Sequence, residues 1–306
     1  MESKKRILIT GSEGFIGRNL KRALEKNGHY VVGVDTDPGP ENLNPPINIL
    51  DENKFRSLVE MVQPHIVVHL AASVGRVLCE DVIKRTIEDN AFMTAIVAKT
   101  CGDLGVKLVY TSTSEIYGDF GNEEADEDTI PKLPHNLYGL SKRWGEEVAA
   151  LYAPDGLCII RPSMPYGPGA PPGRGRRAMD NMMWQAIHDM PIVTHNGAER
   201  SWCWIGDLVD AYVLIIETDQ EGAFNVGRDD DYRSMTEIAQ RACDLAGKDY
   251  SLITMVDPPG NQTAVKRLST KKLKDLGWSP KVELDEGEKI LFEWISQFDE
   301  NGKFFT

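Results

Sequence analysis

The sequence has no long hydrophobic run, because its longest uncharged apolar stretches, such as Ala211–Ile216, are far too short to cross a bilayer. The apolar stretch nearest the amino end, Ile7–Ile9, is too short for the core of a signal peptide and is more typical of a first β-strand. We therefore expect no membrane-spanning segment and no membrane partner.

Positive charge is also scarce, since 34 basic residues face 47 acidic ones and the net charge is −13. A surface of this sign argues against nucleic acid or an anionic membrane as a general partner. The remaining composition, 41% apolar and 26% charged, is that of an ordinary globular protein. It excludes a disordered chain and a small disulfide-stapled domain.

Cysteine is sparse, and the cysteines lie far apart in the sequence. The six histidines show no metal-ligand spacing. The five cysteines have neither CxxC nor metal-ligand spacing, and they are Cys79, Cys101, Cys158, Cys203 and Cys243. We interpret them as buried thiols in a reducing compartment, which predicts a cytoplasmic protein without a metal site.

Short β-branched runs alternate with amphipathic stretches in the first half of the chain. Such alternation predicts an α/β fold, with a doubly wound, Rossmann-type parallel sheet covered on both faces. The predicted helices include Phe15–Lys26 and Ala91–Asp103. The predicted strands are Arg6–Thr10, Tyr30–Val34, Ile66–Leu70, Lys107–Tyr110 and Leu157–Ile160.

The composition of the sequence changes near residue 162, where a Pro- and Gly-rich loop over residues 165–175 follows the last predicted strand. We expect a Rossmann domain over 1–162 and a smaller α+β domain over 163–306, with a soft boundary that the chain can cross again. The second part contains helix-like stretches and one strand-like stretch: Ala178–His188, Ala223–Val226, Thr236–Ala246 and Glu286–Phe298.

A glycine triplet follows the first predicted strand and begins the first predicted helix. Gly11, Gly14 and Gly17 have G-x-x-G-x-x-G spacing. Glycine is required where a turn is tight, where backbone meets a pyrophosphate, and where helix packs closely on strand. The helix N-terminus adds free N–H groups and the positive end of its dipole. This pattern predicts a dinucleotide site, although glycine triplets also occur in plain turns.

Asp35 ends the second predicted strand, 18 residues after Gly17. A carboxylate there accepts hydrogen bonds from the adenosine ribose hydroxyls and repels a 2′-phosphate. No arginine follows closely, and Asp37 adds negative charge. The sequence therefore favours NAD over NADP.

Tyr138 and Lys142 are four residues apart, which places them on one face of a helix. A lysine cation beside a phenol favours the phenolate, so the pair can take a proton from a sugar hydroxyl while hydride leaves for nicotinamide. Ser112, Thr113 and Ser114 follow a predicted strand, at the edge where ligands of parallel sheets collect. Thr113 can bind the same substrate oxygen; the alternative for all three is a turn or helix cap.

Several segments together resemble one family nearly end to end. They are TGSEGFIG, VVHLAA, TSTSEIYG, YGLSK, RPSMPYGPG, RSWCWIGDLVDA, FNVG and LGWSPK. The chain resembles the extended short-chain dehydrogenases that act on nucleotide sugars, the NAD-dependent epimerase/dehydratase group. The resemblance implies an enzyme that transiently oxidises sugar C4 and recycles its NAD.

The resemblance also assigns roles to individual residues. It implies that Tyr138 is the base, that Lys142 holds the nicotinamide ribose, and that Thr113 occupies the Ser/Thr position beside Ser114. Besides the glycine turn and Asp35, it places cofactor contacts at Phe15, Ile16, Asn48, Ile49, Leu70, Ala71, Ala72 and Pro162.

Glu115 bears on the reaction that follows oxidation. Thr113-Ser114-Glu115 resembles the triplet of GDP-mannose 4,6-dehydratases and UDP-glucuronate decarboxylases, and a positioned carboxylate is suited to removing the C5 proton. The alternative is a carboxylate bonded to local backbone N–H groups. Epimerase, dehydratase and decarboxylase outcomes therefore stay open, with an epimerase or dehydratase acting on a UDP-sugar favoured.

The resemblance implies substrate contacts at Arg177, Asn181, Arg200 and Arg267. Arginine suits bidentate phosphate binding, and the alternative for each is an ordinary ion pair. A homodimer through Ala91–Asp103 and Leu140–Leu151 is implied as well.

Two departures from the family pattern point to an unusual substrate, namely Met164 in place of the usual Asn and the stretch 73–85 that borders the sugar. A third, Asn48, stands where an Asp usually meets adenine, and its amide can make a similar contact. Two other functions compete with the enzyme reading, a non-catalytic NAD(H) sensor and an NADPH-dependent carbonyl reductase. The retained Tyr138 and Lys142 argue against the first, and Asp35 argues against the second.

Overall fold

The computed structural model describes residues 4–37, 46–129, 131–153, 155–172, 177–260 and 263–304. The chain forms two compact units, each assembled from separated segments. Unit 1 consists of Met1–Ile116, Leu137–Arg161 and Val209–Phe224. Unit 2 consists of Tyr117–Asn136, Pro162–Leu208 and Asn225–Thr306.

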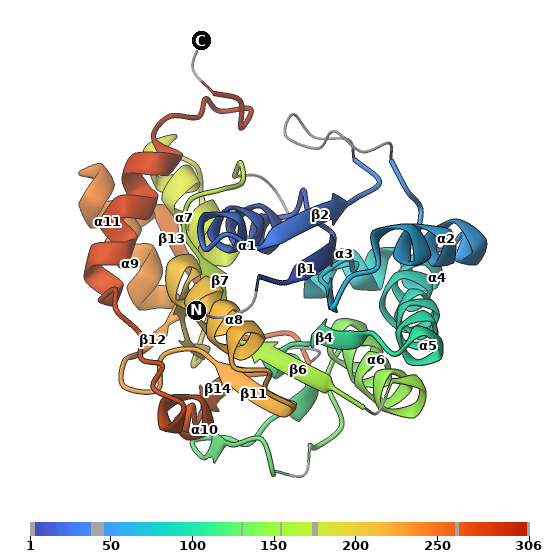
Figure 1. Cartoon of the computed structure of the whole chain (residues 1–306). Helices are drawn as coiled ribbons and strands as arrows, with labels where there is room; N and C mark the ends of the chain where they lie inside the picture. Colours follow the sequence, from blue (N-terminus) through green and yellow to red (C-terminus); the bar gives the residue numbers. More distant parts are fainter. Residues whose placement is uncertain are drawn as a thin grey trace. The chain divides into compact units, whose positions relative to one another are not determined.

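Unit 1 is built on a six-stranded sheet with the order β11-β6-β4-β3-β1-β2 (Figure 1). The strands are β1 (Arg6–Thr10), β2 (Tyr30–Val34), β3 (Ile66–His69), β4 (Lys107–Thr111), β6 (Leu157–Pro162) and β11 (Gly222–Val226). The pairs from β2 across to β6 are parallel. The predicted Rossmann-type sheet is confirmed, and its five predicted strands differ from the observed ones by at most two residues at one end.

Helices cover both faces of this sheet (Figure 1). α1 (Phe15–Lys26) packs on one face, and on the other a single core cluster joins the strands to α2 (Glu52–Val62), α5 (Met93–Leu104) and α6 (Leu137–Tyr152). Phe55, Val97 and Leu108 in this cluster are fully buried, and burying each such side chain contributes about 1.5–3 kcal/mol. The remaining short helices of unit 1 are α3 (Arg76–Asp81), α4 (Ile83–Ile87) and the π-helix η1 (Glu88–Phe92).

Unit 2 is organised around α7 (Ala178–Ile187), α9 (Met235–Ala246) and α11 (Leu284–Ile295), whose apolar faces share one core. Its four-stranded sheet has the order β12-β9-β14-β5, with strands Tyr232–Ser234, Glu199–Ser201, Val265–Leu268 and Glu124–Ala125. Two smaller pairs join β13 (Ile253–Val256) to β8 (Ile192–His195) and β10 (Cys203–Trp204) to β7 (Pro165–Tyr166).

The remaining elements are short or pass between the units. η2 (Ser114–Tyr117) and α8 (Ile205–Glu217) each contain residues of both units, and η3 (Tyr250–Leu252) and α10 (Lys271–Asp275) belong to unit 2. The strand predicted over Ala223–Val226 is β11, which belongs to the six-stranded sheet.

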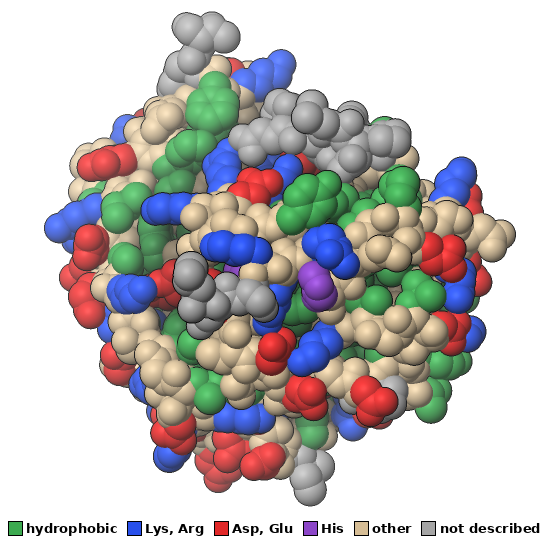
Figure 2. All heavy atoms as spheres, in the orientation of Figure 1, with side chains coloured by type: hydrophobic (Ala, Val, Ile, Leu, Met, Phe, Trp, Pro, Cys, Tyr) green, Lys and Arg blue, Asp and Glu red, His purple; other side chains and the backbone are tan. Residues whose placement is uncertain are grey.

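All five cysteines are buried free thiols, as predicted. Within the described ranges no helix is long and apolar enough to cross a membrane. The same ranges hold no group of three or more His, Cys, Asp or Glu side chains able to bind a metal ion. On the face shown in Figure 2, acidic and basic side chains are interspersed.

Candidate active site

The glycine turn between β1 and α1 leaves no room for side chains. Gly11 has φ +72°, and a Cβ there would lie 2.7 Å from the Ala71 nitrogen. A Cβ on Gly17 would lie 2.2 Å from the Gly11 oxygen, so helix and turn are in backbone contact. Gly14 begins α1 without a side-chain cap, and Phe15 and Ile16 follow it in the first helical turn. The turn therefore has the close backbone approach that a pyrophosphate site requires.

Asp35, at the end of β2, is tied to this turn. Its Oδ2 accepts a hydrogen bond from the Glu13 nitrogen at 3.0 Å, and its Oδ1 accepts one from Asp37 N at 3.2 Å. The carboxylate is half-buried beside the turn. Of the neighbouring predicted contacts, Asn48 is exposed and caps its own turn by accepting from Leu50 N, whereas Ile49 is buried in the unit 1 core.

Leu70–Ala72 continue β3 and meet the end of β1. The Leu70 nitrogen donates to Thr10 O at 3.1 Å, and the Ala71 nitrogen donates to Thr10 Oγ1 at 3.3 Å. All three residues are half-buried. The structure thus brings Gly11, Asp35 and Ala71 together at the carboxyl end of the sheet.

Thr113 and Tyr138 meet at the same end. Their side chains share a hydrogen bond, although one follows β4 and the other lies in the first turn of α6. Burial raises the pKa of Tyr138 to about 12, and the hydrogen bond with Thr113 opposes this rise. Thr113 is thus one group beside Tyr138 that favours the phenolate, and the role predicted for Lys142 stays a prediction.

Lys142 is almost fully buried. Its Nζ lies 4.5 Å from the centroid of the Tyr110 ring, and burial lowers the pKa of Lys142 to about 7 while the Glu146 carboxylate opposes this. Glu146 itself forms a bidentate pair with Arg161 of β6, at 3.0 and 2.8 Å. This pair ties α6, the helix that carries Tyr138 and Lys142, to the sheet.

Ser114 and Glu115 form the start of η2. Glu115 N donates to Thr113 Oγ1 at 3.3 Å, so the backbone of this turn helps to fix the Thr113 hydroxyl. Ser114 is buried and Glu115 is half-buried. Ser112, directly before them, is buried with its hydroxyl unpartnered within the described part of the chain.

A buried polar network that the sequence analysis missed supports these residues. Asn90, within the π-helix η1, donates from Nδ2 to Ser73 O and to Ser141 Oγ, both at 2.9 Å, and accepts from Ser73 N at 2.8 Å. Ser141 in turn donates to Tyr138 O at 3.0 Å. A π-helical turn is rare and frequently marks a functional site. Nothing in the apolar periodicity of residues 88–100 singles this asparagine out.

His69 extends the same network to the glycine turn. Its Nδ1 lies 2.7 Å from Thr10 Oγ1 and its Nε2 lies 3.2 Å from Thr94 Oγ1, which donates to Asn90 O. Burial, with the Lys142 cation nearby, lowers the pKa of His69 to about 3. The imidazole is therefore neutral at physiological pH and links β1 to the η1–α5 helix.

The short helix α3 supplies two further residues that sequence reasoning missed. Glu80 Oε1 accepts a hydrogen bond from Leu137 N at 2.9 Å and so caps the helix that carries Tyr138. Cys79 is fully buried, and burial raises the pKa of its thiol. Both lie in the stretch that departs from the family pattern.

The predicted substrate residues lie in unit 2, and each arginine is engaged by the protein. Arg177 pairs with the buried Asp180 at the start of α7 and donates weakly to Ala170 O. Asn181 is half-buried one turn later and donates its backbone N–H to Arg177 O. The structure thus places Arg177 and Asn181 side by side.

Arg200 and Arg267 lie on adjacent strands of unit 2. Arg200 is buried and donates to the backbone carbonyls of Glu199, Thr263 and Ala264 at 2.5–2.9 Å. Arg267 donates to Glu199 Oε1 at 2.7 Å and lies over the Tyr232 ring.

Pro162 ends β6, two residues before Met164, which has φ +39°. A positive φ is unusual for a residue with a side chain and indicates a constrained backbone at this departure from the family pattern.

The residues at the carboxyl end of the unit 1 sheet fit a dinucleotide. The backbone at Gly11 and Gly17 has the close approach that a pyrophosphate needs. The Asp35 carboxylate beside it can accept hydrogen bonds from ribose hydroxyls, and the unpartnered Ser112 hydroxyl can donate one.

Comparison with known proteins extends this picture. Residues 7–227 match the model of the NAD dependent epimerase/dehydratase family. A UDP-N-acetyl-alpha-D-glucosaminuronate decarboxylase of Bacillus cytotoxicus is 29% identical, with 97% of this chain and 99% of the relative aligned. A UDP-glucuronic acid decarboxylase of Arabidopsis thaliana is 27% identical, with 95% of this chain and 89% of the relative aligned. Curated dTDP-glucose 4,6-dehydratases are also similar.

Among solved structures, the UDP-glucose 4-epimerase of Thermus thermophilus in complex with NAD is similar over 95% of this chain and 99% of that one. Its TM-score is 0.85 and its sequence identity is 25%.

Proposed function

Because the chain belongs to the NAD-dependent epimerase/dehydratase family, we propose that it is an enzyme that oxidises a nucleotide-diphosphate sugar at C4. The observation that carries the proposal is the hydrogen bond between Thr113 and Tyr138 at the carboxyl end of the sheet, the end that also holds the glycine turn. Bound NAD supplies a reversible hydride acceptor.

Tyr138 takes the proton of the C4 hydroxyl, and Thr113 stabilises the phenolate that does so. Lys142, a buried residue of α6, holds the nicotinamide ribose. Since burial lowers the pKa of Lys142 to about 7, its charge is easily changed near neutral pH. Hydrogen bonds from Asn90 to Ser141 and from Leu137 to Glu80 hold α6 against η1 and α3.

We propose that the cofactor lies against the backbone of the glycine turn, with Asp35 accepting hydrogen bonds from the adenosine ribose. This carboxylate favours NAD over NADP because it repels a 2′-phosphate. The further cofactor contacts that we propose are Asn48, Ile49, Leu70, Ala71, Ala72 and Pro162.

The fate of the 4-keto sugar decides the reaction. A UDP-uronate with a C4 ketone is a β-keto acid: it loses carbon dioxide from C5, is reprotonated there, and regains the hydride at C4. The extended similarity to UDP-uronate decarboxylases supports this outcome. In a dehydratase, Glu115 would instead remove the C5 proton; in a 4-epimerase, the ketone would rotate and be reduced from its other face.

The nucleotide end of the substrate is proposed to bind unit 2. Arg177 and Asn181, four residues apart at the start of α7, are the first candidates. Arg267 is a second phosphate ligand. Arg200 would have to release at least one backbone carbonyl in order to bind a phosphate.

Mass spectrometry on reactions with NAD and a panel of nucleotide sugars tests the proposal. Loss of carbon dioxide from a UDP-uronate identifies a decarboxylase, and loss of water identifies a dehydratase with Glu115 as base. An unchanged mass with a new chromatographic peak identifies an epimerase. Strong preference for NADPH, or full biological activity of Tyr138→Phe, would contradict C4 oxidation through this site.

We also propose a homodimer through α5 and α6. Large apolar side chains stay exposed on this part of unit 1, namely Phe92, Trp144, Leu151 and Tyr152. Exposed apolar surface of this kind marks interaction sites. Light scattering should give twice the chain mass, and Leu151→Glu should give a monomer. The buried free thiols support a cytoplasmic location.

A further inference from the structure

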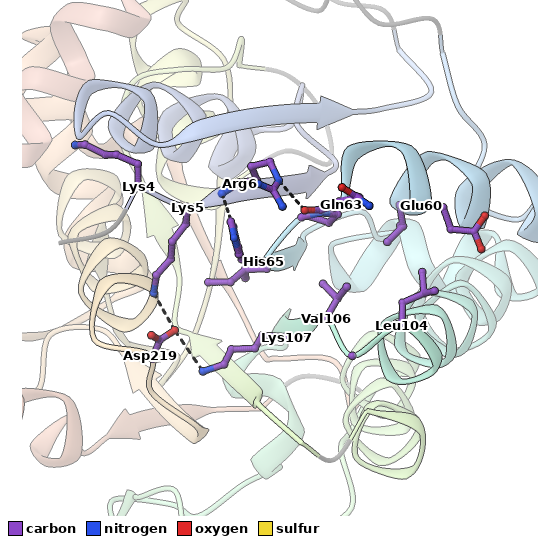
Figure 3. A pocket seen from close by; sticks show the side chains of 14 residues that line it. Lys4, Lys5, Arg6, Glu60, Gln63, His65, Leu104, Val106, Lys107 and Asp219 are labelled. Carbon is purple, nitrogen blue, oxygen red and sulfur yellow. Dashed lines mark hydrogen bonds and ion pairs between the residues drawn. The ribbon is translucent and has the colours of Figure 1, made fainter.

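A cavity that contains no residue of the candidate active site lies at the amino end of the unit 1 sheet. It has a volume of about 780 Å³ and is lined by the residues that begin β1, β3 and β4, by the end of α2, and by Asp219. Figure 3 shows side chains from these separate segments around it. We call it the amino-end pocket.

Positive charge is concentrated here, in contrast to the chain as a whole. Lys4, Lys5, Arg6 and Lys107 line the pocket. Of the two acidic lining residues, Glu60 is paired with Arg56, which lies outside the lining. Among the described lining residues, Asp219 is therefore the only carboxylate left to balance Lys5, Arg6 and Lys107, while the Lys4 ammonium donates to Asn27 O outside the lining.

Asp219 shows how the pocket holds an anion. One of its oxygens lies 2.8 Å from Lys5 Nζ and 3.3 Å from Lys107 Nζ. The Lys5 hydrogen bond, aided by Lys107, holds the pKa of the Asp219 carboxyl below its ordinary value. Two ammonium groups thus share a single carboxylate that is itself half-exposed, so the site retains excess positive charge.

Hydrogen-bond donors remain available around the pocket. Arg6 donates from Nε to Gln63 O at 2.7 Å, and its terminal nitrogens have no partner within the described ranges. His65 accepts from Arg6 N at Nδ1, so its proton is on Nε2, which is likewise unpartnered in the described chain. Guanidinium and ammonium groups together suit the oxygens of a phosphate.

We propose that the amino-end pocket binds a small phosphate-bearing anion, at the opposite end of β1, β3 and β4 from the candidate active site. A ligand with two or more negative charges is favoured, because a single carboxylate leaves the cations unbalanced. The apolar floor formed by Val59, Ile66 and Val106 gives room for an attached organic group. Such a ligand would join the amino ends of three central strands.

Calorimetric titration with inorganic pyrophosphate tests the proposal on the full chain saturated with NAD and UDP. The nucleotides occupy the candidate active site, so the remaining heat reports the pocket. We expect one site, weakened about tenfold or more in Arg6→Gln/Lys107→Gln. Lys54→Gln/Lys84→Gln removes the same charge from exposed positions elsewhere and should leave the affinity unchanged.

Asp219→Asn supplies a test of opposite sign, which holds even where the double variant fails to fold. Removing the competing carboxylate should tighten pyrophosphate binding several-fold. ADP binding more tightly than pyrophosphate under the same conditions would identify a nucleotide as the ligand, and equal affinity would identify the phosphate group alone. Absence of binding by the unmodified chain at millimolar concentration, or equal weakening in both double variants, would overturn the proposal.

Discussion

The two ends of the unit 1 sheet are formed by the same strands, but their polar side chains differ in burial. At the carboxyl end, His69, Thr94 and Asn90 are buried and bonded to one another. At the amino end, charged groups reach the surface: the side chains of Lys107 and Asp219 are 41% and 51% exposed, although that of Lys5 is only 13% exposed. The carboxyl end contains a buried network of neutral hydrogen bonds beside the buried Lys142, and the amino end contains charges that reach the solvent.

This difference shows how a parallel sheet separates two kinds of site. Buried neutral hydrogen bonds hold geometry, because an unsatisfied partner inside the protein is costly. Exposed charges attract ligands and respond to salt, but they hold geometry poorly. The carboxyl end is therefore suited to chemistry, and the amino end is suited to reversible anion binding.

The largest expected effect comes from removing the base at the carboxyl end. Tyr138→Phe should lower kcat by about 10²–10⁴-fold, the usual contribution of a positioned acid–base group. NAD binding, measured by fluorescence titration, should be retained. Tyr30→Phe, at the exposed start of β2, is the matched control and should keep full turnover. Equal turnover in the two variants would remove Tyr138 from the chemistry.

A pair of glycine variants compares the two ends directly. Gly11 and Gly105 both have positive φ, at +72° and +64°, but a Cβ would meet Ala71 at the first and nothing within 4 Å at the second. Gly105→Ala should therefore cost only the left-handed strain, about 1–2 kcal/mol. Gly11→Ala should cost clearly more and should abolish NAD binding. Chemical denaturation measures both, and equal losses would mean that the turn can yield.

The pH dependence of stability should distinguish the buried lysine from the exposed ones. Burial lowers the pKa of Lys142 to about 7, whereas an unfolded lysine titrates near ~10.4. Between these values the unfolded chain binds more protons, so this residue makes stability rise with pH, by at most about 1.4 kcal/mol per unit. Below pH 7 the full cost of burying the charge remains.

Lys142→Met should lose this rise between pH 7 and 9, and Lys107→Met at the exposed end should keep it. Urea denaturation of the three proteins at several pH values is the measurement. Parallel pH profiles for the unmodified chain and Lys142→Met would contradict a buried, perturbed lysine.

The smallest effect concerns the cap on α6. Glu80→Ala should cost about 1 kcal/mol of stability, as other helix caps do, and should lower kcat because the first turn carries Tyr138. Glu80→Gln keeps an acceptor for Leu137 N and should restore most of both. A loss of kcat in Glu80→Gln as large as in Glu80→Ala would mean that charge, not capping, is the contribution.

Features formed by residues close together in the sequence could be predicted, and contacts between residues far apart in the sequence could not. β1, the glycine turn and α1 lie within 21 residues, and the predicted bounds Arg6–Thr10 and Phe15–Lys26 match the structure. Tyr138 and Thr113 were identifiable because each lies in a recognisable local motif. The cap from Glu80 to Leu137 spans 57 residues and the bridge from Lys5 to Asp219 spans 214, so no local pattern reveals them.

The electrostatics were less predictable than the positions. The spacing of Tyr138 and Lys142 suggested a cation that lowers the pKa of the phenol, whereas burial, which the spacing does not show, raises it and the Thr113 hydrogen bond lowers it. Burial, which depends on the whole fold, decides the charge of Lys142. Ile49, expected at the cofactor, is buried in the unit 1 core, and its contact with the cofactor stays a prediction.

The segmented make-up of unit 1 has a consequence for synthesis on the ribosome. Its sheet is complete only when β11, at Gly222–Val226, has been made, some sixty residues after β6 ends at Pro162. At about 5–20 residues per second this interval lasts several seconds. Throughout it, β6 can pair with β4 on one side only, and its other edge is open, the kind of edge that attracts other chains. We therefore expect the nascent chain to be most prone to pairing with other chains while residues 163–221 are being translated.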